Sequence, residues 1–348
     1  MTEAVVSVRD LRAWYATEGD PARAVDGVSL EVRAGETLGL VGESGCGKST
    51  LARAILGLLP DSAAVAGEIR FAGRNLVGLA TGELRELRGP ELGLIFQEPM
   101  TRLDPLMKVE DHFLETLRAH EPGLDQTEMR RRSLETLAGM GIPPTRFTHY
   151  PHEFSGGMRQ RIMIALALVL RPSLVVADEP TTALDVIVEA QILAILADLR
   201  RNFDTALLLI THNLGIVAES CDRVAVMYAG EIVEQGEIRE VFADPAHPYT
   251  RELLRSTISL STAELHYIPG APPNLVDPPP ACRFHPRCPN AMRVCAQKHP
   301  IEVEVGRGAE AAGSPHVASC WLNGPEAEIP DGGERPLERE EIALAEEA

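Results

Sequence analysis

The stretch Gly42-Glu43-Ser44-Gly45-Cys46-Gly47-Lys48-Ser49 fits the pattern G-x-x-x-x-G-K-[ST]. It follows a short apolar run, Thr37 to Val41, and opens a helix-like segment, Lys48 to Leu58. Glycines let successive backbone N–H groups curl around an anion, and a helix behind them presents its positive end to the same phosphates. An ordinary Gly/Ser turn before a helix is the alternative. The strand, the helix and the Gly-Lys-Ser ending favour a loop that binds a nucleoside triphosphate.

Within this loop, Lys48 is expected to pair with the β- and γ-phosphates, and the Ser49 hydroxyl to ligate Mg²⁺. The residues predicted to contact the nucleotide here are Gly42, Ser44, Gly45, Cys46, Gly47, Lys48, Ser49 and Thr50. Cys46 fills a position where Ser or Gly would also serve. Because helix N-termini lower thiol pKa values, a further hypothesis is that Cys46 makes the site sensitive to alkylation.

The composition of the chain bounds its class. A length of 348 residues predicts two domains, or one domain with appendages. The longest uninterrupted apolar run, Ile162 to Leu170, has nine residues, whereas a membrane span needs about 20. No basic segment followed by an apolar one is visible near Met1, so a cytoplasmic location is expected.

The net charge of −18, from 51 acidic and 33 basic residues, argues against a nucleic-acid partner. A nucleic-acid binder needs a dense basic face to neutralise phosphates, and no Lys/Arg cluster of that kind is present. Part of the acidity lies in residues 325–348, which lack aromatic side chains and are predicted to form a disordered tail.

Strand-like and helix-like segments alternate along the chain, which predicts an α/β fold whose parallel sheet is covered on both faces. Between Glu98 and about Leu170 the pattern is helical, with Pro-rich breaks. Val224–Tyr228 and Glu231–Glu234, joined by Ala229-Gly230, are typical of a hairpin. The other expected strands are Val5–Val8, Val28–Val32, Thr37–Val41, Gly67–Ala72, Leu92–Phe96, Leu174–Ala177 and Ala206–Ile210, with a helix over Val186 to Arg200.

The composition changes sharply from Pro269, where closely spaced prolines exclude a regular core and indicate a linker or an extended wrap. A domain boundary is therefore expected between residues 255 and 275. The predicted organisation is an ATPase domain over 1–265 with a helical subdomain at about 98–170, a Pro/Cys-rich domain over 266–324, and the acidic tail over 325–348.

A phosphate loop needs a carboxylate on the Mg²⁺ side, and Asp178-Glu179 supplies one after the apolar run Leu174 to Ala177. In α/β sheets, ligands bind at the carboxyl ends of the strands. Asp178 is expected to hold Mg²⁺, and Glu179 to polarise the water that attacks the γ-phosphate. A strand that ends in a solvated acidic turn is the alternative, and the phosphate loop in the same chain argues against it.

Ser155-Gly156-Gly157 stands directly before a helical run, Arg161 to Leu170. A hydroxyl, bare N–H groups and a helix dipole converge there, so the segment is either a second anion site or a simple N-cap. If it is an anion site, the chain contains two helix starts that bind phosphate, one at the phosphate loop and one at Ser155-Gly156-Gly157, more than a hundred residues apart. They make sense if two chains face each other, and each nucleotide is shared between them.

These motifs resemble those of the ATP-binding subunits of ABC transporters, a P-loop NTPase family with a mixed sheet and a helical subdomain. Ser155-Gly156-Gly157 is similar to the signature motif, with Phe154 and Met158 in place of the usual Leu and Gln. The resemblance implies nucleotide contacts for all three of these residues. It further assigns Gln97 to the Q-loop that touches Mg²⁺, and Asp185 to the D-loop.

Two further assignments also rest on this resemblance. His212 matches the switch histidine that contacts the γ-phosphate, although Asn213 replaces the usual Asp beside it. Tyr15 stands where the family stacks an aromatic ring on adenine, with Trp14 as a rival. The implied catalytic residues are Glu179, His212 and Gln97, and the implied Mg²⁺ ligands are Ser49, Gln97 and Asp178.

The match is closer to the oligopeptide/dipeptide and nickel importer branch, on Tyr150 to Arg161, Pro245 to Thr250 and Ile268 to Pro273. It implies an ATP-hydrolysing subunit, peripheral on the cytoplasmic face of the plasma (inner) membrane, that powers import of oligopeptides or dipeptides. The implied partners are two membrane permease subunits, a sister ABC ATPase and an extracytoplasmic peptide-binding protein. The alternatives are a soluble ABC ATPase acting on nucleic acid, which the charge disfavours, and a kinase, which the Ser155-Gly156-Gly157 site disfavours.

Four of the six cysteines gather near the end of the chain, at Cys282, Cys288, Cys295 and Cys320. Their spacings, with five, six and twenty-four residues between them, fit neither paired zinc-ribbon cysteines nor the bacterial ferredoxin pattern. Because a reducing cytoplasm disfavours disulfides, the four thiols are interpreted as holding a metal cluster or a zinc ion, and unoccupied thiols are the alternative. The family resemblance points to a [4Fe–4S] cluster.

Overall fold

The computed structural model describes residues 4–95, 103–181, 186–256, 266–306, 314–325, 328–330 and 332–336. The chain divides into two compact units. The first unit comprises Met1–Val6, Glu31–Thr37 and Phe71–Ile210, and the second comprises Ser7–Leu30, Leu38–Arg70 and Thr211–Ala348. Among the described residues, no helix combines the length and the apolar character that crossing a bilayer requires.

A parallel sheet forms the centre of the first unit. Its strands are β6 (Leu92–Ile95), β7 (Leu174–Asp178) and β8 (Ala206–Ile210). Strand β7 pairs with both others in parallel, with Val176 opposite Leu94 on one side and Leu208 on the other. These strands are nearly continuous buried apolar runs, as expected for a parallel sheet that is covered on both faces. The strand predictions for this unit are confirmed, except at Phe96, which lies outside the described residues.

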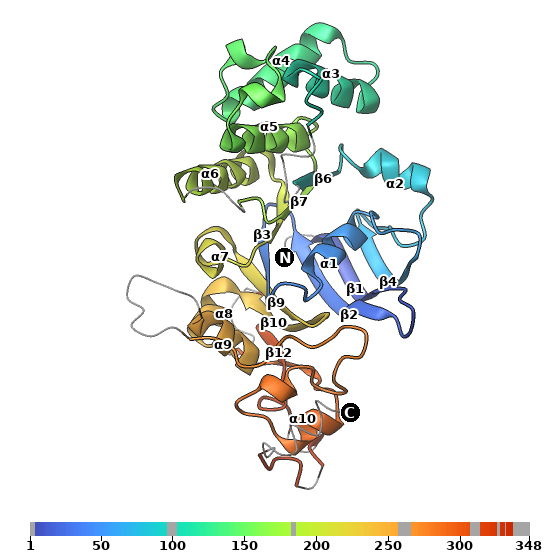
Figure 1. The fold of residues 1–348 in the computed structure, drawn as a ribbon, viewed down its shortest axis with the longest axis vertical. Coiled ribbons are helices and arrows are strands. Elements are labelled where there is room, and N and C mark those ends of the chain that lie inside the picture. Colours follow the sequence, from blue (N-terminus) through green and yellow to red (C-terminus); the bar gives the residue numbers. More distant parts are fainter. Residues whose placement is uncertain are drawn as a thin grey trace. The chain divides into compact units, whose positions relative to one another are not determined.

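Helices dominate the rest of the first unit, and α3, α4 and α5 pack against one another (Figure 1). The edge-to-face pair Phe113–Phe147, with ring centroids 6.1 Å apart, lies in their core. The predicted helical character is therefore confirmed from residue 109 onward; residues 96–102 lie outside the described part. The helices are α2 (Thr81–Leu87), α3 (Val109–His120), α4 (Gln126–Gly139), α5 (Gly156–Leu168) and α6 (Val186–Phe203), with 3₁₀ turns at Pro144–Arg146 and Pro151–Glu153 and a short strand β5 (Arg74–Asn75).

The second unit is built on β3 (Thr37–Val41), β9 (Arg223–Tyr228) and β10 (Glu231–Glu237). Strand β3 runs parallel to β9, and β9 turns back through a tight hairpin into β10. Both residues of the turn have positive φ, 46° at Ala229 and 92° at Gly230. Such a turn matches the twist of a two-residue hairpin, so the predicted hairpin is confirmed.

Long strands and short helices complete the second unit, with β1 between β2 and β4. The predicted strands near the N-terminus are confirmed but are longer than expected. The predicted helix from Lys48 to Leu58 ends earlier, at Ile55, because Gly57 adopts a left-handed φ of 61°. The elements are β1 (Ala4–Tyr15), β2 (Ala22–Arg33), α1 (Lys48–Ile55), β4 (Ala63–Phe71), α7 (Leu214–Ser220), α8 (Ile238–Ala243) and α9 (Pro248–Arg255).

The Pro/Cys-rich region continues the sheet of the second unit. Strand β12 (Val317–Ser319) pairs antiparallel with β10, and β11 (Glu302–Glu304) pairs with β12. A 3₁₀ turn at His285–Arg287 and helix α10 (Arg293–Gln297) precede β11 in the chain. The domain limits proposed from composition stay a prediction, but these strands extend the sheet that begins at β3.

A buried carboxylate fastens this C-terminal region to the sheet. Glu234, 1% exposed, accepts the N–H groups of Ala246 (2.7 Å) and His247 (2.9 Å) and contacts Nε2 of His316 at 2.7 Å. Burial alone would raise the pKa of Glu234, but hydrogen bonds from His316 and from the two N–H groups lower it below its usual value. The hydrogen bonds of Glu234 thus join β10, the start of α9 and the segment before β12.

Candidate functional site

The phosphate loop connects β3 to α1 and has the backbone that its glycines permit. Gly42, Gly45 and Gly47 have φ values of 153°, 80° and 111°, which other residues rarely adopt. A Cβ at Gly42 would lie 2.1 Å from the carbonyl oxygen of Met227, and one at Gly47 would lie 1.9 Å from that of Ala24. The glycines are therefore required both by conformation and by close backbone approach.

Lys48 begins helix α1 and folds back over its own loop. Its side chain is largely buried, and Nζ donates to the carbonyl oxygens of Gly42 at 2.8 Å and Glu43 at 2.9 Å. The amine is thus held at the mouth of the loop, next to the N-terminal end of a helix, where an anion is stabilised. Ser49 and Thr50 follow it in the first turn of α1.

Cys46 does not have the properties that the sequence led us to expect. Its side chain is buried, and this burial raises the pKa of the thiol above its usual value, although Lys48 acts in the opposite direction. The hypothesis that the helix N-terminus lowers this pKa is therefore wrong. Desolvation of the thiolate outweighs the charge and the hydrogen bonds of Lys48.

The two candidate adenine-stacking residues at the end of β1 have different surroundings. The Tyr15 hydroxyl lies 3.5 Å from Oγ1 of Thr50 in helix α1. The guanidinium of Arg23 instead stacks over the Trp14 ring, 5.4 Å from the centroid of that ring. Tyr15 is therefore the aromatic residue placed beside the phosphate-loop helix.

His212 and Asn213 follow in the same unit. His212 is exposed and directly precedes the N-cap of α7. The Asn213 side chain accepts the N–H groups of Gly215 at 3.0 Å and Ile216 at 3.4 Å, so it caps this helix. The replacement of the family's Asp by Asn is compatible with this role, since both residues are good N-caps.

In the first unit, Asp178 is the last residue of β7, and Glu179 follows it with a φ of 47°. The Glu179 N–H donates to the carbonyl oxygen of Ile210 at 2.9 Å, which fixes the backbone at this position. Both carboxylates are half-buried. A left-handed conformation at a residue other than glycine is strained, and such strain concentrates at functional sites.

The Ser155-Gly156-Gly157 segment begins helix α5. Ser155 is the N-cap, and its hydroxyl accepts the N–H of Met158 at 3.4 Å. Ser155 and Gly156 are exposed, so the helix start is open to a ligand as well as capped. Farther along α5, the buried Gln160 donates through Nε2 to the carbonyl oxygen of Pro180 at 2.6 Å, which ties this helix to the backbone next to Glu179.

The predicted site residues are divided between the two units, and Tyr15 and Thr50 are in contact within the second. Tyr15, residues 42–50 and His212 belong to the second unit, whereas Asp178, Glu179 and residues 155–157 belong to the first. Gln97 and Asp185 lie outside the described residues.

The four C-terminal cysteines gather in one region of the second unit. The Cys282 N–H donates to the carbonyl oxygen of Cys295 at 3.0 Å, and Cys295 packs in a small core with Val294 and Trp321. Burial raises the thiol pKa of all four. The pKa of Cys282 is raised further by the charges of the other three cysteines. Within the described part of the chain they form no disulfide, and no group of three or more Cys, His, Asp or Glu side chains is placed to ligate a metal ion.

Residues far from the phosphate loop also touch it, and the sequence analysis did not identify them. The Tyr249 hydroxyl accepts the N–H of Glu43 at 2.8 Å, and Arg287 makes an ion pair with the Glu43 carboxylate at 2.7 Å. Tyr249 stands in the segment Pro245 to Thr250, which was noticed only as a mark of family resemblance. Arg287 had no signal of its own beyond its place among the cysteines.

Models of two protein families match the chain. The ABC transporter family matches residues 25–182, which include the phosphate loop, Asp178 and the signature segment. The C-terminal region of oligopeptide/dipeptide transporters matches residues 233–295, which include the first three of the four cysteines.

Individual relatives agree with these matches. The oligopeptide transport ATP-binding protein OppD of Salmonella typhimurium is 48% identical over 86% of this chain and 90% of its own length. The dipeptide transport ATP-binding protein DppD of Bacillus subtilis is 45% identical over 94% of this chain and 97% of its own. The ATP-binding cassette MJ0796, solved as a dimer in a post-hydrolysis state with ADP and phosphate, is 28% identical with a TM-score of 0.61, over 67% of this chain and 99% of its own. The chain therefore belongs to the ATP-binding subunits of ABC transporters, in the oligopeptide/dipeptide branch, and is an ATPase that powers peptide transport.

Proposed function

We propose that this chain binds Mg·ATP on its phosphate loop and completes each site with the Ser155-Gly156-Gly157 helix start of a partner ATPase. In this mechanism the loop N–H groups and Lys48 hold the phosphates, and Tyr15 stacks on the adenine. The exposed N-terminus of α5 adds a hydroxyl and backbone N–H groups on the opposite side of the γ-phosphate. The observation that carries the proposal is the phosphate loop itself, with three positive-φ glycines and Lys48 folded over it.

Hydrolysis is assigned to Glu179, with His212 contacting the γ-phosphate and Asp185 and Gln97 completing the site. The strained backbone and the half-buried side chain of Glu179 support this role, because a fixed carboxylate orients an attacking water well. Ser49, Asp178 and Gln97 would hold Mg²⁺, and their hydroxyl, carboxylate and amide oxygens are the ligands this ion prefers. The ion would neutralise charge on the β- and γ-phosphates.

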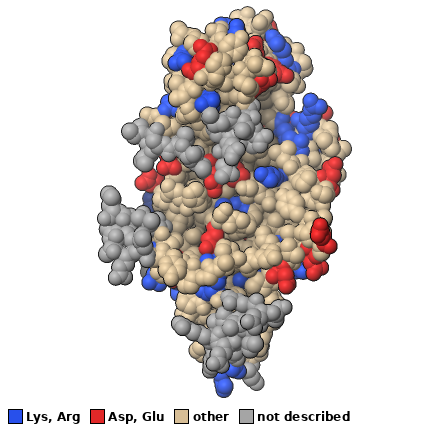
Figure 2. All heavy atoms as spheres, viewed as in Figure 1, with Lys and Arg blue, Asp and Glu red and all other residues tan. Residues whose placement is uncertain are grey.

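The partners proposed for this subunit are two membrane permeases, a sister ABC ATPase and an extracytoplasmic peptide-binding protein, on the cytoplasmic face of the plasma membrane. The names of the relatives, which are oligopeptide and dipeptide transport proteins, support import of one of these cargos. On the face drawn in Figure 2, Lys and Arg are interspersed with Asp and Glu. This distribution, together with the net charge of −18, supports a role without nucleic acid.

Steady-state hydrolysis by the assembled transporter tests this function. The wild type is expected to hydrolyse Mg·ATP faster in the presence of peptide-loaded binding protein. Lys48→Ala should abolish turnover by weakening ATP binding. Turnover that needs neither permeases nor peptide, but rises with added DNA or RNA, would contradict the proposal.

We further propose that Cys282, Cys288, Cys295 and Cys320 hold a [4Fe–4S] cluster. The support is the chemistry of the donors: four thiols lie in one region of the second unit, two around the His285–Arg287 turn, one in helix α10 and one directly after β12. In the described residues their side chains are not placed to ligate a metal ion, so holding a cluster requires them to move closer together. A cluster would supply a covalent staple to a Pro-rich segment that has little apolar core of its own. Redox chemistry is not needed for that role.

Iron and acid-labile sulfide analysis of anaerobically purified protein tests the cluster. The expected result is about four of each per chain, lost in Cys295→Ser and retained in Cys221→Ser, which alters a buried cysteine outside the group. Stoichiometric zinc, or the absence of both metals, would refute it.

A further inference from the structure

Glu43, the second residue of the phosphate loop, is held by all three of its polar groups. Its N–H donates to the Tyr249 hydroxyl at 2.8 Å, and its carbonyl oxygen accepts from Lys48 Nζ at 2.9 Å. Its carboxylate receives both terminal nitrogens of Arg287, at 2.7 Å and 3.0 Å. The peptide on which Lys48 rests is therefore oriented by two residues from the C-terminal part of the chain.

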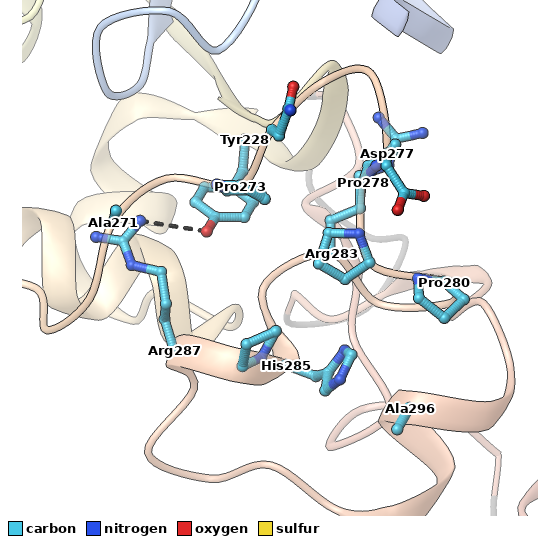
Figure 3. Close-up of a pocket in the computed structure, with 13 residues that line it drawn as sticks. Tyr228, Ala271, Pro273, Asp277, Pro278, Pro280, Arg283, His285, Arg287 and Ala296 are labelled. Atoms are coloured by element: carbon cyan, nitrogen blue, oxygen red, sulfur yellow. Dashed lines mark hydrogen bonds between the residues drawn. The ribbon is translucent and has the colours of Figure 1, made fainter. Parts of the chain in front are cut away.

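The Arg287 side chain is held by other hydrogen bonds besides its ion pair with Glu43. It is 4% exposed, and Nε donates to the carbonyl oxygen of Pro269 at 2.8 Å. It also donates to the Tyr228 hydroxyl at 3.2 Å, the bond drawn on the wall of the cavity in Figure 3. Because these hydrogen bonds already hold the guanidinium, it loses little conformational entropy when it pairs with a carboxylate. The bidentate ion pair with Glu43 is therefore a rigid contact.

Tyr249 is fixed by aromatic packing. Its ring lies 4.6 Å from that of Tyr228 and 5.3 Å from that of Phe284, and Tyr228 and Phe284 are 5.1 Å apart. All three side chains are almost completely buried. Phe284 comes from the same loop as Arg287, between Cys282 and Cys288, so this loop supports both contacts to Glu43.

We propose that Arg287 and Tyr249 are positioning residues for ATP binding: through Glu43 they hold the phosphate loop in the shape that receives the phosphates. The cysteine-containing C-terminal segment thereby sets the ATP affinity of this subunit. This inference rests on the proposed function, since it assumes that the loop binds Mg·ATP. Neither residue is proposed to touch the nucleotide or the reacting atoms. Because each acts only through the shape of the phosphate loop, losing one is expected to lower the affinity for Mg·ATP.

Arg287→Met tests the proposal, with Arg283→Met as its matched control. Arg283 lies in the same loop with a side chain that is 6% exposed, and it pairs with Asp26 and with Glu231 at 2.9 Å. None of these partners belongs to the phosphate loop. Both variants are expected to lower the unfolding temperature, but only Arg287→Met should weaken Mg·ATP binding, by about tenfold, as judged from the strength of charge-assisted hydrogen bonds.

The kinetic readout separates positioning from general damage. Arg287→Met is expected to raise the KM for ATP by about the same factor while leaving kcat at saturating ATP near the wild-type value. Arg287→Lys, which keeps the charge but not the fork, should recover part of the affinity. Adding Glu43→Gln to Arg287→Met should cause little further loss, because the two side chains act as one unit.

Equal shifts in ATP affinity for Arg287→Met and Arg283→Met would overturn the inference, as would an unchanged affinity in the first. If Arg287→Met does not fold, Arg287→Lys and Glu43→Gln decide, and wild-type affinity in both would overturn it. Failure of the wild-type protein to bind Mg·ATP would instead refute the proposed function.

Discussion

Replacing Gly47 by alanine should damage the folded protein before any nucleotide is added. A Cβ at this position would lie 1.9 Å from the carbonyl oxygen of Ala24 and 2.8 Å from Cε of Met227, at a φ of 111°. Side-chain carbons do not approach other atoms closer than 3.0 Å, so β2 and the loop would have to separate. The same loop offers a matched control at Gly45, where φ is 80° but no atom lies within 4 Å of the added carbon.

The two substitutions differ mainly in this clash, which sets their expected magnitudes. Gly45→Ala carries only the cost of a left-handed alanine, about 1 kcal/mol. Gly47→Ala adds overpacking against backbone, for a total of at least about 3 kcal/mol. At roughly 2–4 °C per kcal/mol, the unfolding midpoint should fall by about 2–4 °C in the first and by about 6 °C or more in the second.

Differential scanning calorimetry of nucleotide-free protein measures both midpoints. Mg·ATP binding is expected to weaken in both variants, since phosphates approach the loop backbone closely, so stability without nucleotide is the deciding readout. Equal midpoints for the two variants would contradict this prediction, because the expected difference comes from the space around each glycine alone.

The remaining predictions concern catalysis, the signature helix and pH. Glu179→Gln should retain bound ATP and lower kcat by about 100-fold or more, measured as phosphate release and as nucleotide retained after gel filtration; turnover at the wild-type rate would remove this carboxylate from its role. Ser155→Ala should lower turnover while ATP still binds to the phosphate loop, and should cost about 1 kcal/mol of stability through loss of the N-cap; full activity would argue that the serine is only a cap. The hydrogen bonds that lower the pKa of Glu234 stabilise the fold above its unfolded pKa of about 4.3, and this contribution is lost as the pH falls through the lower folded value. Acid unfolding of Glu234→Gln should therefore depend less on pH in that range than acid unfolding of the wild type, and identical pH dependence would contradict this.

Much of the fold could be predicted because its elements carry local signals. The central strands are uninterrupted apolar runs, and Ala229-Gly230 punctuates the hairpin with the residues that a tight turn requires. Helix α2 was not anticipated. It has no buried side chain and therefore no apolar periodicity to reveal it.

The residues of the candidate site could be predicted where they lie in short, contiguous sequence motifs. The phosphate loop, Asp178-Glu179 and the Ser155 helix start are each contiguous, so spacing alone singles them out. The contacts of Arg287 and Tyr249 with Glu43 join residues more than 200 positions apart, and no local pattern encodes them. The pKa of Cys46 was mispredicted for a related reason, because burial depends on packing that sequence does not display.

The shared site between two subunits is tested most directly by ATP turnover of the assembled transporter when Gly156 is replaced by aspartate, together with the equivalent glycine of the sister ATPase. Mg·ATP is expected to bind still to the phosphate loop, while the carboxylate at the opposing helix start repels the γ-phosphate and turnover falls by about 100-fold or more. Turnover at the wild-type rate in that doubly altered complex would contradict a site shared between the two subunits.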